Sequence, residues 1–150
     1  MIIADVDLEK LAKTPPMDFG GPIVGTVQRF TPNNLINLPQ TLIGVEDFLP
    51  GSTVDWVFWH DEVQYILQGE ADVTYTLVPN HDKVNTVHIG PGKVYIILNG
   101  TRATFKVTSK EPYTHLCVIS PRYHYDRWLL KKEFEGVSLA EYRQRMGQAV

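Results

Sequence analysis

Residues 84–108 read VNTVHIGPGKVYIILNGTRATFKVT, and this stretch decides the fold. Short runs of Val, Ile, Thr, Tyr and Phe are separated in it by Gly-Pro-Gly and Asn-Gly, which is typical of β-strands joined by tight turns. Asn99-Gly100 favours a hairpin turn, because both residues tolerate a positive φ. The stretch therefore predicts three strands, at Val84–Ile89, Val94–Leu98 and Thr101–Thr108.

The same pattern of short β-type runs separated by turn residues continues on both sides of this stretch. It predicts four more strands, at Val54–Trp59, Val63–Leu67, Ala71–Val78 and Tyr113–Ile119. Many short strands at close spacing, without a helical period between them, are typical of an antiparallel sandwich or barrel. We therefore expect an all-β domain.

The two ends of the chain differ from this central region. Pro and Gly interrupt the N-terminal third often, so we expect an irregular N-terminal arm with extended pieces at Ile23–Phe30 and Thr41–Phe48. Near the other end, Ser138 and Glu141 form a capping box, which predicts a short helix over Leu139–Met146.

Composition limits the size and the class of the protein. The 150 residues, 43% hydrophobic and 21% charged, fit one domain over residues 1–150 with a barrel core at about 41–120. The net charge is −3 and the basic residues are scattered, so we expect no nucleic acid partner. No segment has the pattern of a membrane span or a secretory signal, and we expect a cytoplasmic protein with no membrane partner.

Two stretches resemble the paired motifs of the cupin superfamily. Residues Glu62–Gly69 keep the Glu-to-Gly spacing of the first motif, and Gly51 stands upstream where that motif begins. Residues Pro91–Gly100 keep the glycine spacing of the second motif. The resemblance covers residues 51–120 and implies a single-domain cupin fold, that is, a double-stranded β-helix or jelly-roll barrel around a small-molecule pocket.

The metal site of the family is mostly missing from this chain. A typical cupin holds its metal with histidines from both motifs and a glutamate from the first. Here the first-motif histidines fall within Asp55–Trp59, which contains none, and the second-motif histidine is Ala103. Glu62 is a direct match, and Tyr95 stands where ectoine synthase-like cupins, which the chain partly resembles, have a metal-binding tyrosine. The resemblance fixes no cofactor but allows a divalent metal (Fe, Zn or Mn) held by Glu62, His60 and Tyr95.

The candidate catalytic residues are Glu62, His60 and Tyr95. If Glu62 faces inward, the aromatic residues around it exclude water, which favours its protonated form and makes it a better acid or base near neutrality. His60 is two positions away and could hydrogen-bond Glu62 or share a metal with it. Alternatives stay open: Glu62 as a polar strand start, His60 as a surface turn residue, and Tyr95 as an ordinary strand aromatic.

The inner walls of the expected pocket supply candidates for substrate binding. Gln64 shares a strand face with Glu62, because alternate residues of a strand point to the same side. Trp56 and Phe105 are the candidate aromatic walls, and Phe105 also matches an aromatic that often follows the second motif.

Two further candidates carry polar groups. Arg102 lies beside the vacant second-motif position and could clamp a substrate carboxylate, or it is an exposed residue after a turn. His115 shares a strand face with Cys117, the only cysteine, and becomes a replacement ligand or base if that face lines the pocket. The aromatic segment Tyr123–Trp128 either packs the C-terminal region against the barrel or closes the pocket mouth.

These residues favour an enzyme that acts on a small polar molecule. We expect a non-oxidative lyase, isomerase or dehydratase reaction on a carboxylate- or carbonyl-bearing substrate, with Glu62 as acid or base. The alternative is a non-catalytic ligand-binding or sensor cupin, with a mostly apolar pocket and a fully hydrogen-bonded Glu62. We also expect a homodimer, because apolar pieces such as Ile23-Val24 need cover and small cupins often pair through sheet edges.

Overall fold

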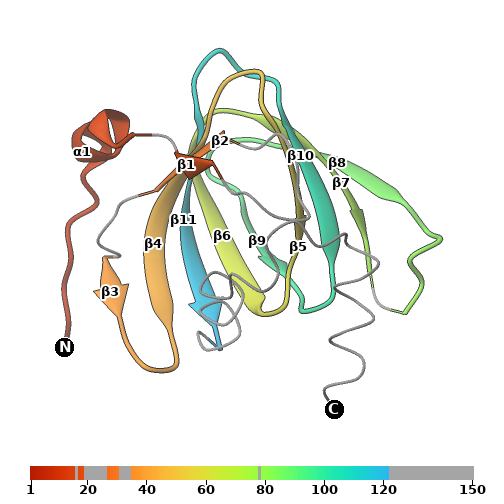
Figure 1. The fold of residues 1–150 in the computed structure, drawn as a ribbon, viewed down its shortest axis with the longest axis horizontal. Helices are drawn as coiled ribbons and strands as arrows, with labels where there is room; N and C mark the ends of the chain where they lie inside the picture. The colour runs from red at the N-terminus through yellow and green to blue at the C-terminus, as the bar shows by residue number, and fades with distance from the viewer. Residues whose placement is uncertain (16, 19–26, 31–34, 78, 122–150) are drawn as a thin grey trace.

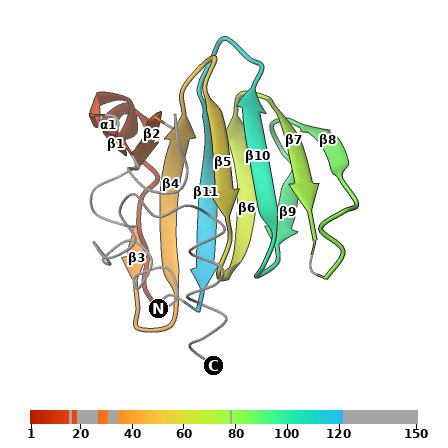
Figure 2. The same ribbon diagram turned by 45° about the vertical axis from the view of Figure 1, so that its right-hand side comes forward.

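The computed structural model describes residues 1–15, 17–18, 27–30, 35–77 and 79–121. This part of the chain forms two antiparallel β-sheets that face each other, with one short helix at the N-terminal end (Figures 1 and 2). The all-β architecture predicted from the sequence is therefore confirmed.

The larger sheet, which we call sheet A, contains seven strands. They are β1 (Met17–Asp18), β2 (Val27–Phe30), β3 (Ile36–Asn37), β4 (Leu42–Phe48), β6 (Asp61–Gln68), β9 (Val94–Ile97) and β11 (Tyr113–Ser120). Their order is β1-β2-β4-β11-β6-β9, and β3 also pairs with β4. Strand β9 is thus an edge strand of sheet A within the described part of the chain.

The smaller sheet, sheet B, contains four strands. They are β5 (Thr53–Val57), β7 (Ala71–Thr76), β8 (Asn85–Ile89) and β10 (Arg102–Val107). Their order is β5-β10-β7-β8, so that β5 and β8 are the edges. Each of the seven strands predicted over residues 54–119 overlaps one of these strands or β6, β9 or β11.

The turn at Asn99-Gly100 differs from the predicted hairpin. It joins β9 of sheet A to β10 of sheet B, so the two strands that it connects do not pair with each other. The amide of Thr101 donates to the carbonyl of Leu98 (3.0 Å), and Gly100 alone of the central pair has a positive φ, of 88°. A local turn signal was read correctly, but which strands pair is decided by contacts far apart in the sequence.

The N-terminal arm contains a helix that the sequence analysis did not predict, α1 (Leu8–Lys13). Asp7 caps it, because its side chain accepts a hydrogen bond from the amide of Lys10 (2.8 Å). The helix buries Leu11 and lies beside β4 (Figure 1). The C-terminal helix predicted over Leu139–Met146 lies outside the described residues, as do Tyr123–Trp128 and Ile23-Val24.

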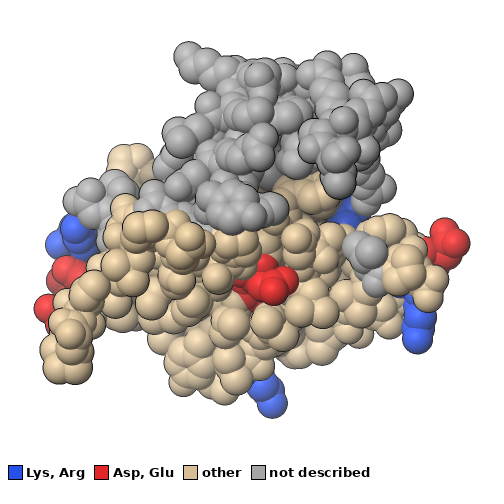
Figure 3. Space-filling model, turned by 90° about the horizontal axis from the view of Figure 1, so that it is seen from below, with Lys and Arg blue, Asp and Glu red and all other residues tan. Residues whose placement is uncertain are grey.

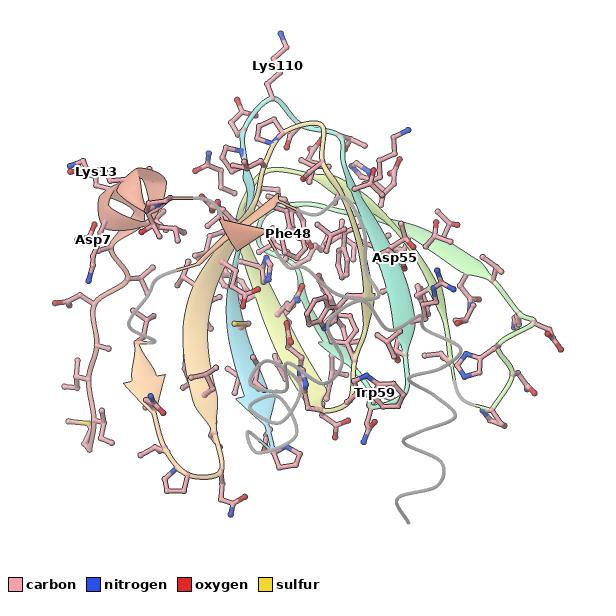
Figure 4. The ribbon with its side chains drawn as sticks, in the orientation of Figure 1. Asp7, Lys13, Phe48, Asp55, Trp59 and Lys110 are labelled. Carbon is pink, nitrogen blue, oxygen red and sulfur yellow. The ribbon has the colours of Figure 1, made fainter. Side chains whose placement is uncertain are left out.

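The hydrophobic core lies between the two sheets and is rich in aromatic rings. Phe48 of sheet A meets Phe105 of sheet B edge-on, with ring centroids 5.4 Å apart, and stacks on Tyr113 at 6.0 Å. Figure 4 shows Phe48 inside the barrel, whereas Lys13 and Lys110 lie at its periphery. Such edge-on and offset contacts stabilise a core beyond the area they bury.

Steric constraints explain why the position that ends the first motif, Gly69, is a glycine. Gly69 ends the turn after β6 with a φ of 75°, and a Cβ at this position would lie 2.2 Å from the carbonyl oxygen of Pro112. Glycine is the residue that meets both demands, since it has no Cβ and tolerates a positive φ. The motif spacing therefore marks the place where two chain segments approach closely.

Candidate functional site

A buried polar cluster lies on the inner face of β6. Glu62 and Gln64 point inward, and His60 precedes the strand on the same side. The Nε2 atom of His60 is 2.8 Å from Oε2 of Glu62, and Nε2 of Gln64 donates to Oε1 of Glu62 at 2.5 Å. All three residues are at most 4% exposed. An ionised Glu62 thus accepts a hydrogen bond on each of its oxygens, which offsets the cost of burying the charge.

The register of β9 on β6 adds Tyr95 to this cluster. Tyr95 lies directly opposite Gln64, and its hydroxyl donates to Oε1 of the Gln64 amide. The hydroxyl of Tyr113 is 2.8 Å from that of Tyr95. Because Tyr95 gives its single proton to Gln64, Tyr113 is the donor to Tyr95. The result is one chain of contacts, from His60 through Glu62, Gln64 and Tyr95 to Tyr113.

This chain of contacts orients groups rather than conducting protons. The Gln64 amide donates through nitrogen and accepts through oxygen, so it fixes both neighbours without passing a proton between them. Burial raises the pKa of Tyr95 well above its usual value, and the neighbouring Tyr113 and Glu62 raise it further. Tyr95 therefore stays a neutral phenol near pH 7 and can act as a hydrogen-bonding group but not as a base.

A cavity of about 590 Å³ lies between β7, β8, β9 and β10. Its walls are mostly apolar and include Val73, Ile97, Ala103 and Phe105. Tyr95 also lines it, so the phenol is the point at which the polar cluster meets the cavity. Glu62, His60 and Gln64 face the barrel interior but stand behind Tyr95 rather than on the cavity wall.

The described residues do not fit the metal site of typical cupins. Trp56, within the segment that would carry the first-motif histidines, pairs across β5 and β10 with Ala103, and both side chains are buried and apolar. Nor do the three ligands proposed from the sequence converge. His60 and Glu62 bond to each other directly, and Tyr95 reaches them through Gln64. In the described part of the chain, no three His, Cys, Asp or Glu side chains are placed to hold a metal ion.

The structure does not bring Arg102 to the cavity. Alternation along β10 turns Ala103 and Phe105 inward and Arg102 outward. There its Nη2 atom lies 2.5 Å from Oδ2 of Asp55 on the neighbouring strand. This guanidinium therefore lies on the opposite side of the sheet from the cavity, as the alternative of an exposed residue after a turn expects.

The other three candidates, Phe105, Trp56 and His115, lie in different parts of the barrel. Phe105 lines the cavity, whereas Trp56 belongs to the core. His115 is fully buried on the inner face of β11, with its ring edge-on to Phe48 at 5.0 Å. Its Nε2 atom is 3.5 Å from Oε2 of Glu46, and neither ring nitrogen has a hydrogen-bond partner among the described residues. His115 is thus an interior histidine away from the cavity wall.

Sequence reasoning missed Tyr113 and Thr101. Tyr113 begins β11 two positions before His115, so strand periodicity places it on the same inner face, but its contact with Tyr95 depends on the folded structure. Thr101 lines the cavity directly after the turn between the two sheets. The residue itself carries no signal, because small polar residues are common after turns.

Comparison with solved structures places the architecture among known folds. Over 79% of this chain and 76% of the other, the Cnp3 cupin domain of Schizosaccharomyces pombe superposes with a TM-score of 0.55 at 17% identity. The fold is that of the cupins. A predicted oxalate decarboxylase of Thermotoga maritima matches 80% of this chain and 99% of its own, with a TM-score of 0.55 at 17% identity.

The polyketide cyclase RemF of Streptomyces resistomycificus has the same architecture. It covers 79% of this chain and 80% of its own, with a TM-score of 0.54 at 15% identity. No protein-family model and no curated sequence matches the chain. No helix in the described residues is long and apolar enough to cross a membrane.

Proposed function

We propose that this cupin barrel binds a small, largely apolar molecule in its cavity, with Tyr95 as the main polar contact. The observation that carries this proposal is the cavity itself, about 590 Å³ in volume and lined mostly by apolar side chains. Small-molecule sites typically have this size and combine apolar walls with a few placed polar groups. Burial of an apolar ligand supplies affinity, and Tyr95 supplies orientation.

The polar cluster behind Tyr95 supports this role. Buried polar groups stabilise a fold less than apolar ones of the same shape, so a fully connected cluster inside a barrel favours a task other than stability. Glu62 holds Gln64, and Gln64 holds the Tyr95 hydroxyl in one orientation. A hydroxyl so fixed presents its remaining lone pair to the ligand at little entropic cost.

The lining also indicates the ligand class. Tyr95 already donates to Gln64, so it suits a ligand that donates a hydrogen bond, such as a phenol or an alcohol. Lys93 is a further polar lining residue and can meet an acidic group, whereas His88, which also lines the cavity, already bonds to Asp72 (2.8 Å). The ligand we propose therefore has an aromatic or alicyclic body and one or two polar groups.

Calorimetric titration with 2-naphthol tests the proposal. We expect saturable binding that weakens about two- to tenfold in Tyr95→Phe, the worth of one hydrogen bond. Binding of 2-methoxynaphthalene, which has no hydroxyl to donate, should change little in the same variant. Tyr65→Phe is the matched control, since Tyr65 points out of the barrel from β6. Equal binding of 2-naphthol by the Tyr95→Phe and native proteins would overturn the role of Tyr95.

A second candidate is a non-oxidative lyase, isomerase or dehydratase that works by proton transfer, favoured by the buried His60–Glu62 pair. Two of the similar structures are named as enzymes, a polyketide cyclase and a predicted oxalate decarboxylase, so proteins with this fold include enzymes. This candidate stands second because the pair lies behind Tyr95 rather than on the cavity wall.

Deuterium exchange of 2-tetralone in D₂O tests the enzyme candidate. In this reaction a base removes a proton from the carbon beside the carbonyl, and the enolate takes up a deuteron at the same carbon. If Glu62 is the base, the native protein should accelerate exchange and Glu62→Gln should lose about a hundredfold to ten-thousandfold of that rate. Exchange at the buffer rate, or equal rates in both proteins, would reject this candidate.

A further inference from the structure

The hydroxyl of Thr101 is buried without a hydrogen-bond partner among the described residues. Thr101 is 3% exposed and lines the cavity directly before β10. Its backbone groups are both bonded, since the amide donates to the carbonyl of Leu98 (3.0 Å) and the carbonyl accepts from the amide of Phe58 (2.9 Å). The backbone therefore holds the residue in place, while the side-chain hydroxyl keeps its donor and acceptor capacity unused.

A buried hydroxyl without a partner is uncommon in folded proteins. Burial removes the water that would bond to it, and the cost is comparable to that of a lost hydrogen bond. The hydroxyl of Tyr95, which also belongs to a cavity-lining residue, differs in this respect because it donates to Gln64. A ligand in the cavity that carries a hydrogen-bond acceptor would remove the cost at Thr101.

Thr101 can present its hydroxyl to a ligand by rotation about the Cα–Cβ bond. The hydroxyl and the methyl group share one Cβ atom, so a rotation of about 120° exchanges their positions without moving the backbone. In the ligand-free protein no rotation is favoured by a hydrogen bond to a described residue. A ligand acceptor would select the rotamer that places the hydroxyl on the cavity wall.

We propose that Thr101 is a second polar contact of the ligand site and donates a hydrogen bond to a carbonyl oxygen of the ligand. This inference rests on the proposed ligand site and narrows its ligand class. Leu98, to whose carbonyl Thr101 bonds, follows Tyr95 by three residues, which is about 10 Å of extended chain. The ligand therefore carries a hydroxyl for Tyr95 and a carbonyl for Thr101 at opposite ends of its apolar body.

The surroundings of Thr101 favour a neutral acceptor over a carboxylate. Strand β9 ends and β10 begins at the lower end of the barrel (Figure 2), and the described surface seen from below carries few and scattered charges (Figure 3). The lysine that lines the cavity, Lys93, precedes β9 at its opposite end. A carboxylate beside Thr101 would be desolvated far from this ammonium group, whereas a carbonyl needs one hydrogen bond.

Calorimetric titration with two matched naphthols tests the proposal. 6-Acetyl-2-naphthol carries a hydroxyl and a carbonyl at opposite ends, and in 6-isopropenyl-2-naphthol a methylene group replaces the carbonyl oxygen. The measured quantity is the ratio of the two affinities, acetyl over isopropenyl. We expect this ratio to fall about two- to tenfold in Thr101→Val, because a methyl group there replaces the donor. Thr101→Ser keeps the donor and should keep most of the native ratio.

Two further variants serve as controls. Thr53→Val makes the same chemical change at an exposed residue that begins β5 and does not line the cavity, so it should leave the ratio unchanged. Tyr95→Phe should weaken the binding of both naphthols alike and also leave the ratio unchanged, because both compounds carry the hydroxyl that Tyr95 accepts from.

A stability measurement separates ligand binding from a structural role of the hydroxyl. Without ligand, Thr101→Val should leave the urea midpoint unchanged or raise it, because it removes a buried unpaired hydroxyl. A lower midpoint, or equal ratios in the native protein and Thr101→Val, would overturn the role of Thr101 and leave the ligand site standing. If neither naphthol binds the native protein, the ligand site is rejected and this contact with it.

Discussion

Strands β10 and β6 show opposite patterns of burial. In β10 of sheet B, apolar residues point into the barrel and polar residues point to solvent; the inward residues are Ala103, Phe105 and Val107. In β6 of sheet A, polar Glu62 and Gln64 point inward, whereas apolar Val63 and Tyr65 point outward. Strand β10 follows the rule for a sheet with one solvated face, whereas β6 reverses it over Glu62–Tyr65 and returns to it at Ile66, which is 0% exposed and belongs to the core.

The different burial patterns of β10 and β6 indicate that the two strands serve different purposes, β10 the stability of the barrel and β6 its function. Sheet B supplies most of the buried apolar residues of the core, which Phe48, Ile66 and Tyr113 of sheet A complete. Strand β6 gives up apolar burial on its inner face for a polar cluster and exposes apolar surface on its outer face. The inner cluster costs stability unless something is gained, and we account for it by a bound ligand inside the barrel.

The largest expected effect concerns the contribution of β10 to stability. Phe105→Ala should lower the free energy of unfolding by about 3–5 kcal/mol, because it removes a fully buried ring from the core. Lys106→Ala, the next residue and outward-facing, should change it by less than about 0.5 kcal/mol. Urea denaturation measures both, and comparable losses would show that burial on the inner side of β10 is not what stabilises the barrel.

On the functional side, Glu62→Ala should cost about 1–3 kcal/mol, because it leaves the buried amide of Gln64 and the ring of His60 without their shared partner. Glu111→Ala removes a carboxylate from the surface and should leave stability within about 0.5 kcal/mol. Urea melts of the two variants compare them directly. A loss as small as that of Glu111→Ala would mean that the Glu62 contacts contribute nothing to the fold.

The pH dependence of stability tests whether Tyr95 of the polar cluster is a buried neutral phenol. Burial raises the pKa of Tyr95 in the folded state, so the folded protein holds a proton that the unfolded chain releases above about pH 10. Stability should therefore fall as pH rises above about 10, by up to about 1.4 kcal/mol per pH unit for each such proton. Urea melts at pH 9, 10 and 11 should show a shallower fall in Tyr95→Phe. Identical slopes would contradict a buried neutral phenol.

Strands, motif glycines and the inward side of β6 could be predicted from local pattern. Period-two spacing puts Glu62 and Gln64 on one face, and the motif spacing to Gly69 indicates that this face is the inner one. Helix α1 was not predicted, because its six residues are too few to show a helical period, although Asp7 is a good capping residue.

The rest depended on information that local pattern does not contain. Alternation alone cannot tell which side of β10 is inside, and so the sequence left both roles of Arg102 open, the carboxylate clamp and the exposed residue after a turn. The contact of Tyr95 with Gln64 follows from the register of two strands about 30 residues apart, which is set by the packing of the whole barrel. The pairing of Arg102 with Asp55 depends on register in the same way.

Methyl-detected NMR titration with 2-naphthol tests the central claim, that the inner face of the barrel is the ligand site, most directly. Methyl groups of Val73, Ile97 and Ala103 line the cavity, whereas those of Val63 and Val118 point outward from sheet A. We predict saturable shifts in the first group and none in the second. Shifts confined to Val63 and Val118 would place the ligand on the outer face and contradict the account.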